Sequence, residues 1–335
     1  MELFEFSRAG SAKDAVSAGA RSNTAQQGAE VRFIAGGTTL FDLMKLNVER
    51  PTSIVDINHL PFDKVEGTAD GGLRIGALVR NADLAHHPEV IKNYRVLSEA
   101  LLAGASPQLR NRATTGGNLL QRTRCVYFRD SEMPCNKREP GSGCSAIQGF
   151  NRNLALLGTS EHCIASNPSD MNVALMALDA TVHILGVKGE RSVPISEFYL
   201  LPGNSPEREN VLGPGDLVTH VTLPPIAAGT KSLYLKLRDR ASYEFALASA
   251  AVVVAVKDGK FESVRLAMGG IGAIPWRMVE SEAMLKGKAV DASTFRAAAD
   301  AGLRGARPQS ENGFKVELAK RCLVHALTLA TREAS

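Results

Sequence analysis

Residues 31–46 read Val-Arg-Phe-Ile-Ala-Gly-Gly-Thr-Thr-Leu-Phe-Asp-Leu-Met-Lys-Leu, and this stretch decides the fold of the first part of the chain. A short apolar run ends at Gly36-Gly37, and Leu40, Leu43 and Met44 follow at helical spacing. This order predicts a strand, a glycine turn and a helix. A second apolar run at residues 52–57 completes a small parallel β-α-β unit.

The next part of the chain predicts a second sheet with helices. A strand at residues 72–77 is followed by Asn81, which is placed to cap a helix. The other expected elements are a helix at 94–105, a helix at 173–178, a strand at 180–185 and a hairpin-like segment at 216–225.

Beyond a linker at residues 224–230, the pattern predicts a separate C-terminal domain. Its strand-like runs favour an antiparallel three-stranded sheet, formed by residues 233–237, 248–256 and 263–268. Helices follow, and the last of them, at 314–330, places one apolar stripe on its surface, made of Leu318, Cys322, Leu323, Ala326 and Leu327.

Composition sets limits on the function. With 335 residues, 44% hydrophobic and 22% charged, the chain is ordinary globular material. Its net charge of +4 and its short Lys/Arg runs are too weak to indicate a nucleic-acid partner. The N-terminal stretch lacks a basic segment followed by an apolar core, and no run approaches the ~18 apolar residues of a membrane span. We therefore expect no export signal in the chain and no membrane insertion.

The glycine pair at Gly36-Gly37 has a chemical reading. Glycines after a strand let the backbone approach a phosphate, whose charge then faces the N-H groups of the next helix. Thr38 and Thr39 add hydroxyl donors, and residues 114–118, Thr-Thr-Gly-Gly-Asn, repeat the pattern. A dinucleotide fingerprint Gly-x-Gly-x-x-Gly is absent, so a Rossmann NAD site is not supported. A plain tight turn for the first pair and a helix C-cap for the second are the alternatives.

Four of the five cysteines lie in one segment. Cys125, Cys135, Cys144 and Cys163 have nine, eight and eighteen residues between them, whereas Cys322 lies alone on the apolar stripe. Thiolates bind zinc or iron-sulfur clusters, but structural zinc sites usually pair their ligands closely in sequence. A reduced basic loop is the alternative. Nearby cations could offset the charge of a cluster, namely Arg122, Arg124, Arg129, Lys137, Arg138 and Arg152.

These motifs together resemble the FAD-binding subunit of molybdenum hydroxylases, the xanthine dehydrogenase and aldehyde oxidoreductase family. The resemblance is carried by residues 33–40 (Phe-Ile-Ala-Gly-Gly-Thr-Thr-Leu) with Met44-Lys45, by 112–119 (Arg-Ala-Thr-Thr-Gly-Gly-Asn-Leu) and by 168–171 (Pro-Ser-Asp-Met). Their order and spacing match across nearly the whole chain. In addition, Tyr234-Leu-Lys-Leu-Arg with Ala248-Ser249 is similar to the start of that family's C-terminal domain.

The resemblance implies an α+β FAD-binding fold of two α/β subdomains, one a small parallel β-α-β unit and one with a mixed or antiparallel sheet. It implies that the first glycine turn wraps the FAD pyrophosphate and that Asp170 bonds the flavin or its ribityl chain. For Asp170 a helix N-cap is the alternative, and for Lys236 a surface lysine on a strand. The implied site contains Phe33, Ile34, Ala35, Gly36, Gly37, Thr38, Thr39, Leu40, Thr114, Thr115, Gly116, Gly117, Asn118, Asp170 and Lys236.

The cysteine segment departs from most flavin subunits of the family, which lack it. It resembles the branch that adds a [4Fe-4S] cluster, found in 4-hydroxybenzoyl-CoA reductases and, with the closer match, in bacterial periplasmic aldehyde oxidoreductases. The resemblance implies Cys125, Cys135, Cys144 and Cys163 as the cluster ligands. The implied domains are FAD-binding subdomain 1 at 1–60, subdomain 2 at 61–228 with an iron-sulfur loop at 121–165, and a C-terminal flavoprotein domain at 229–335.

The family also implies partners, because the chain shows neither a molybdopterin site nor a plant-type [2Fe-2S] pattern. A large molybdenum-cofactor subunit and a small subunit with two [2Fe-2S] clusters would deliver electrons to FAD here, and FAD would pass them to an external acceptor. No catalytic acid or base is expected in this chain. The location is cytoplasmic, or periplasmic if a signal-bearing partner co-exports it. The alternatives are a free-standing flavoprotein oxidase and a zinc-stabilised binding module.

Overall fold

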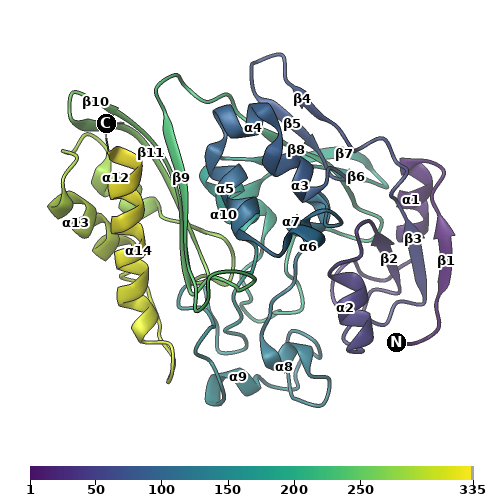
Figure 1. Ribbon diagram of the computed structural model, residues 1–335. Helices are drawn as coiled ribbons and strands as arrows, with labels where there is room; N and C mark the ends of the chain where they lie inside the picture. The colour runs from purple at the N-terminus through teal and green to yellow at the C-terminus, as the bar shows by residue number, and fades with distance from the viewer. Residues whose placement is uncertain (333–335) are drawn as a thin grey trace.

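The computed structural model describes residues 1–332, which form three sheets and the helices that cover them (Figure 1). The predicted C-terminal domain runs to residue 335, and its last three residues, 333–335, lie outside the described part. The predicted α+β class is confirmed.

The first sheet is parallel and has the strand order β1-β3-β2. Its strands are β1 (Glu5–Arg8), β2 (Val31–Ile34) and β3 (Ser53–Asp56), and its helices are α1 (Ala12–Gly19) and α2 (Leu40–Lys45). The β-α-β unit predicted from residues 31–57 is therefore confirmed. The sequence pattern missed β1, because all four of its residues are exposed and no apolar alternation marks it.

The second sheet is antiparallel, in the order β4-β5-β8-β6-β7. The predicted hairpin at 216–225 is wrong, because these residues form a single strand that pairs with β5 on one side and β6 on the other. Which strands pair with one another is not encoded in the local sequence, and so the pattern did not separate a hairpin from a single strand. The strands are β4 (Val65–Gly67), β5 (Leu73–Gly76), β6 (Thr181–Gly186), β7 (Gly189–Pro194) and β8 (Leu217–Leu223).

Two helices, α5 (Arg95–Ala103) and α10 (Asp170–Ala177), lie between this sheet and the C-terminal sheet (Figure 1). Every residue of α10 is buried, so its sequence shows no amphipathic period. The shorter helices of this region are α3 (Asn81–His86), α4 (Pro88–Asn93), α6 (Pro107–Arg110), α7 (Thr115–Leu119), α8 (Val126–Arg129), α9 (Ser145–Gln148) and α11 (Ile195–Phe198).

Two local predictions in this region are wrong. Asn81 does not cap a helix, because α3 begins with it, the N-cap residue of α3 is Arg80, and the Asn81 Oδ1 accepts no hydrogen bond within residues 1–332. The second glycine pair is not a turn but the first turn of α7, whose N-cap Thr114 accepts a hydrogen bond from the Gly117 N-H at 3.2 Å. Small residues at a helix start satisfy the same backbone requirements as a loop, and the pattern did not separate the two.

The C-terminal sheet is antiparallel and contains the three predicted strands plus a two-residue edge strand, in the order β12-β11-β10-β9. The predicted stripe of the last helix packs onto this sheet, with Leu318 only half-buried. The elements are β9 (Lys231–Leu237), β10 (Ala248–Lys257), β11 (Lys260–Gly269), β12 (Trp276–Arg277), α12 (Val279–Leu285), α13 (Ala292–Gly302) and α14 (Phe314–Thr331).

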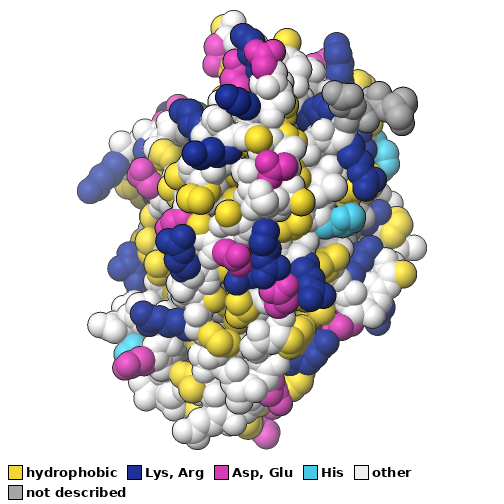
Figure 2. Space-filling view, turned by 90° about the vertical axis from the view of Figure 1, so that its left-hand side faces the viewer, with side chains coloured by type: hydrophobic (Ala, Val, Ile, Leu, Met, Phe, Trp, Pro, Cys, Tyr) yellow, Lys and Arg dark blue, Asp and Glu magenta, His cyan; other side chains and the backbone are white. Residues whose placement is uncertain are grey.

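Acidic and basic side chains alternate over the face that carries α12, α13 and α14 (Figure 2). Several of them pair, for example Arg296 with Glu317 at 2.9 Å and Lys320 with Asp300 at 2.8 Å. Among residues 1–332, no helix is both long enough and apolar enough to cross a membrane.

Candidate functional site

The two glycine segments predicted from the sequence lie in direct contact. A methyl group added to Gly36 would lie 2.0 Å from the carbonyl oxygen of Arg112, which lies three residues before the start of α7. Gly37 has a φ of +74°, in the left-handed region that favours glycine. Only glycine at position 36 allows this approach of the β2–α2 turn to the second glycine segment.

Two cavities open on either side of this contact. One, here called the turn groove, is about 200 Å³ and is lined by every predicted residue from Phe33 to Leu40 and by Thr114. The other, the central cleft, is about 480 Å³ and is lined by Asn118, Asp170 and Lys236. The two cavities share Thr38, Thr39 and Gly117. They therefore adjoin at these three residues.

Thr115 and Gly116 are the predicted site residues that line neither cavity. Their backbone N-H groups donate to the carbonyls of Val79 and Ala77, at 2.9 and 2.8 Å. These bonds fix α7 to the end of β5. The two residues therefore position the site rather than face it.

Asp170 is held by two buried partners from β9. The Tyr234 hydroxyl donates to its Oδ1 at 2.6 Å, and Lys236 Nζ donates to its Oδ2 at 2.8 Å. Burial first, and then the charge of Asp170, raise the pKa of Tyr234 well above its usual value, which keeps the hydroxyl protonated. The carboxylate is thus fixed at the entrance to α10, with one acceptor site left on each oxygen.

The alternative roles considered for Asp170 and Lys236, a helix N-cap and a surface lysine, are both wrong. Ser169, not Asp170, caps α10, because its hydroxyl accepts from the Asn172 N-H at 3.2 Å. Lys236 is not a surface lysine, since its side chain is only 4% exposed. Sequence reasoning missed Tyr234, although strand alternation places it on the same face as Lys236. That alternation was the available signal.

Asn81 also belongs to the site, although the sequence suggested it only as a helix cap. It lines the central cleft, and its buried Oδ1 has no hydrogen-bond partner within the part of the chain that the structure describes. A buried acceptor without a partner is costly, and binding sites are where such atoms are tolerated. A ligand hydroxyl or N-H in the cleft would satisfy it.

The four clustered cysteines line one small pocket, here called the cysteine pocket. Backbone pairing joins Cys135 to Cys144, and Cys125 and Cys163 close the other sides. Burial raises the pKa of the Cys125 thiol to about 12 and also raises the pKa of Cys163. In residues 1–332, no three His, Cys, Asp or Glu side chains lie close enough together to hold a single metal ion.

Buried charges hold the cysteine segment against the rest of the protein. Arg122 pairs with Glu49, which precedes β3, and with Glu209, and its guanidinium lies over the Phe128 ring. Burial would raise the pKa of Glu209, but Arg122 and Lys137 lower it below its usual value. The cations predicted to surround the cysteines therefore act largely on carboxylates of neighbouring elements.

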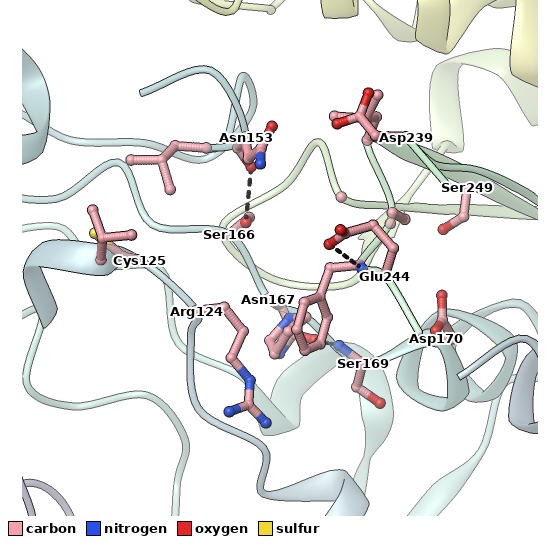
Figure 3. Close-up of a pocket in the computed structure, with 18 of the residues that line it drawn as sticks. Arg124, Cys125, Asn153, Ser166, Asn167, Ser169, Asp170, Asp239, Glu244 and Ser249 are labelled. Carbon is pink, nitrogen blue, oxygen red and sulfur yellow. Dashed lines mark hydrogen bonds between the residues drawn. The ribbon is translucent and has the colours of Figure 1, made fainter. Parts of the chain in front are cut away.

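A third cavity, the cysteine-side cleft, measures about 540 Å³ and lies between the cysteine segment and Asp170. Figure 3 shows Arg124 and Cys125 on one side of it and Asp170 and Ser249 on the other. Arg124 also lines the central cleft. Neighbouring residues, Arg124 and Cys125, therefore line the predicted flavin site and the cysteine pocket respectively.

Comparison with known proteins agrees with this geometry. Residues 2–226 match the family described as the FAD binding domain in molybdopterin dehydrogenase. Residues 233–330 match the family described as the CO dehydrogenase flavoprotein C-terminal domain. The boundary between the two matches coincides with the chain that joins β8 to β9.

Individual relatives cover nearly the whole chain. It is 52% identical, over 93% of its length and 95% of the relative's, to the aldehyde oxidoreductase FAD-binding subunit PaoB of Escherichia coli strain K12. It is 26% identical to the carbon monoxide dehydrogenase medium chain of Hydrogenophaga pseudoflava, with 91% of each chain covered.

Solved structures share the fold. A chain of carbon monoxide dehydrogenase from Hydrogenophaga pseudoflava matches with a TM-score of 0.76 and 24% identity, covering 98% of this chain and 97% of that one. A chain of quinoline 2-oxidoreductase from Pseudomonas putida 86 matches with a TM-score of 0.73 and 22% identity, covering 98% of each. The chain belongs to the FAD-binding subunits of the molybdopterin dehydrogenases and is a flavoprotein subunit of an oxidoreductase.

Proposed function

We propose that this chain carries both FAD and a [4Fe-4S] cluster and acts as the electron-transfer subunit of a molybdenum-cofactor aldehyde oxidoreductase. Aldehydes are the substrate class named for the relative with 52% identity. The observation that carries the cluster assignment is the convergence of four cysteines, spread over 39 residues of sequence, on one pocket. FAD when bound supplies one- and two-electron chemistry, which suits a junction between iron-sulfur centres and an external acceptor.

For FAD, the proposed site is the turn groove and the central cleft together. Their meeting point at Thr38, Thr39 and Gly117 offers hydroxyls and backbone N-H groups to a pyrophosphate. Asp170, fixed by Tyr234 and Lys236, presents an oriented acceptor to the flavin or its ribityl chain. The unpartnered Asn81 Oδ1 supports a donor on the ligand at this end of the cleft.

The donor set fits a cluster better than a single ion. Four thiols without histidine are a common ligand set for [4Fe-4S], and the thiolates that bind a cluster lie farther apart than those that bind one ion.

The partners proposed are a large molybdenum-cofactor subunit and a small subunit with two [2Fe-2S] clusters, with cytoplasmic residence or periplasmic residence after co-export. We also propose domain boundaries at 1–60, 61–228 and 229–335. The three sheets support these boundaries. The last strand of the first sheet ends at Asp56, the second sheet begins at Val65, and the third sheet begins at Lys231. The central cleft has few aromatic side chains, Tyr243 and Phe245, which offers little support for a free-standing oxidase.

The test is an anaerobic purification with the accompanying subunits, followed by quantification of flavin, iron, sulfide, zinc and molybdenum per chain. We expect FAD and about four irons to remain with this subunit after dissociation. Flavin without iron would remove the cluster from the proposal. Zinc without flavin would overturn it entirely.

Replacement of one ligand sharpens the test. In Cys135→Ser the iron should fall to background and the visible absorption of the cluster should disappear. Cys322→Ala is the matched control, because Cys322 lies on the buried face of α14 and does not line the cysteine pocket. If Cys135→Ser keeps its full iron content, Cys135 is not a ligand.

A further inference from the structure

Two arginines of the cysteine segment face the predicted flavin site rather than the cysteines. Arg124 and Arg129 line the central cleft together with Thr38, Gly117 and Asp42. Arg124 Nη1 lies 3.1 Å from Asp42 Oδ2, and Arg129 Nη2 lies 2.9 Å from the same oxygen. Asp42 belongs to α2, the helix that begins after the first glycine turn.

The Asp42 carboxylate pairs with both arginines, and one nitrogen of each guanidinium has no hydrogen-bond partner within residues 1–332. Arg124 Nε and Arg129 Nη1 are buried and have no hydrogen-bond partner within residues 1–332. A buried donor of a charged group that lacks a partner costs more than a neutral one. Both side chains are also about three-quarters buried. An anion bound beside the two side chains would give both donors a partner.

The charge of the central cleft indicates what kind of anion. Its lining carries a net charge of +2, from three acidic and five basic side chains: Asp42, Asp170, Glu244, Arg110, Arg124, Arg129, Lys236 and Arg240. A pyrophosphate diester carries about two negative charges, one per phosphate. Guanidinium donors suit phosphate oxygens because several parallel N-H groups can bind them.

We propose that Arg124 and Arg129 bind the pyrophosphate of FAD, so that the cysteine segment supplies part of the flavin site. The inference rests on the FAD site proposed above and extends it to residues of the inserted segment. Arg124 is adjacent to Cys125, and the guanidinium lies over the Phe245 ring at 5.1 Å. Loss of the cluster would then displace two phosphate-binding cations and weaken flavin retention.

The experiment measures the dissociation constants of FAD, ADP and riboflavin for the deflavinated complex, in wild type, Arg124→Gln and Arg129→Gln. ADP carries the pyrophosphate without the flavin, and riboflavin carries the flavin without phosphate. Each variant should weaken FAD and ADP roughly ten- to a hundredfold and leave riboflavin unchanged. Iron content should stay at the wild-type value.

Arg152→Gln is the matched control. Arg152 lies in the same segment, pairs with Asp239 at 2.7 Å and stacks over Phe314 at 5.0 Å, but it does not line the central cleft. Its FAD affinity should equal that of wild type. Arg124→Lys, which keeps the charge, should show an intermediate loss and covers the case in which the glutamine variants do not fold.

The outcomes separate the two proposals. If the wild-type complex binds no FAD, the proposed function itself fails. If FAD binds but Arg124→Gln, Arg129→Gln and Arg124→Lys all retain wild-type affinity, only the present inference is overturned. An equal loss for ADP and riboflavin would also overturn it, because it would indicate a distorted cleft rather than a lost phosphate contact.

Discussion

The turn groove and the cysteine segment meet at Arg122, yet they are built in different ways. The groove is made from ends of regular elements, β2, α2 and α7, whose glycines let backbone touch backbone. The cysteine segment at 121–165 contains only two single-turn helices, α8 and α9. Side-chain charges such as Arg122 and Lys137 connect it to neighbouring elements.

The difference indicates what keeps each part of the site, the turn groove and the cysteine segment, in its folded conformation. Close backbone packing is complete without a ligand, so the groove should be preformed. A segment with little regular structure depends on its buried ion pairs and, in our proposal, on a cluster. The flavin half should therefore tolerate loss of cofactor better than the cysteine half.

The largest effect is expected from Arg122→Leu. It removes one of the two partners of Glu49 and of Glu209, which keep Arg32 and Lys137 respectively. It should therefore lower the free energy of unfolding by about 3 kcal/mol, the lower end of the cost of breaking a buried pair. Urea denaturation measures the loss, and limited proteolysis should show new cuts within 121–165. Arg296→Leu, whose pair with Glu317 is exposed, should lower the free energy of unfolding far less, because solvent screens the pair. Equal costs would contradict the role of buried charge in this segment.

A smaller effect is expected from Gly36→Ala on the other side of the comparison. The new methyl group would meet the Arg112 carbonyl and push the two glycine segments apart, at a cost of about 1–3 kcal/mol. FAD affinity should fall while iron content is retained. At Gly305 a methyl group meets only a side-chain atom of Leu157 at 3.8 Å, so Gly305→Ala is the control. Unchanged FAD affinity in Gly36→Ala would show that the groove is not set by this contact.

A pH-dependent effect concerns Lys315, a fully buried lysine of α14. Its Nζ donates to the carbonyls of Leu154, at the end of the cysteine segment, and Gly270, at 2.8 and 2.6 Å. Burial lowers its pKa to about 7, and an unfolded chain keeps a lysine pKa near about 10.4. Between these values the unfolded chain binds more protons, so this amine makes stability rise with pH.

The slope from Lys315 should approach about 1.4 kcal/mol per pH unit between pH 7 and 10. Denaturation of wild type and Lys315→Met at pH 7, 8 and 9 should show a shallower dependence in the variant. Lys320→Met, at a more exposed ion pair with Asp300, should keep the wild-type slope. If Lys315→Met and wild type show the same slope, Lys315 stays charged in the folded protein.

Much of the architecture could be predicted because its signals are local. The apolar run before Gly36 and the spacing of Leu40, Leu43 and Met44 gave the first β-α-β unit, and the stripe of α14 gave the last helix. The hairpin at 216–225 and the cap at Asn81 were wrong, because pairing partners and ligand contacts are not encoded in a few neighbouring residues.

By itself, the sequence determined the fold class, the residues that form the two glycine segments and the set of four clustered cysteines. Only the tertiary structure decided that Gly36 touches Arg112, that Tyr234 and Lys236 fix Asp170, and that Arg124 and Arg129 face the central cleft. The two kinds of signal act over different separations in the sequence. Periodicity and turn chemistry act within about ten residues, whereas these contacts join residues separated by 64 or more positions and depend on how the sheets pack.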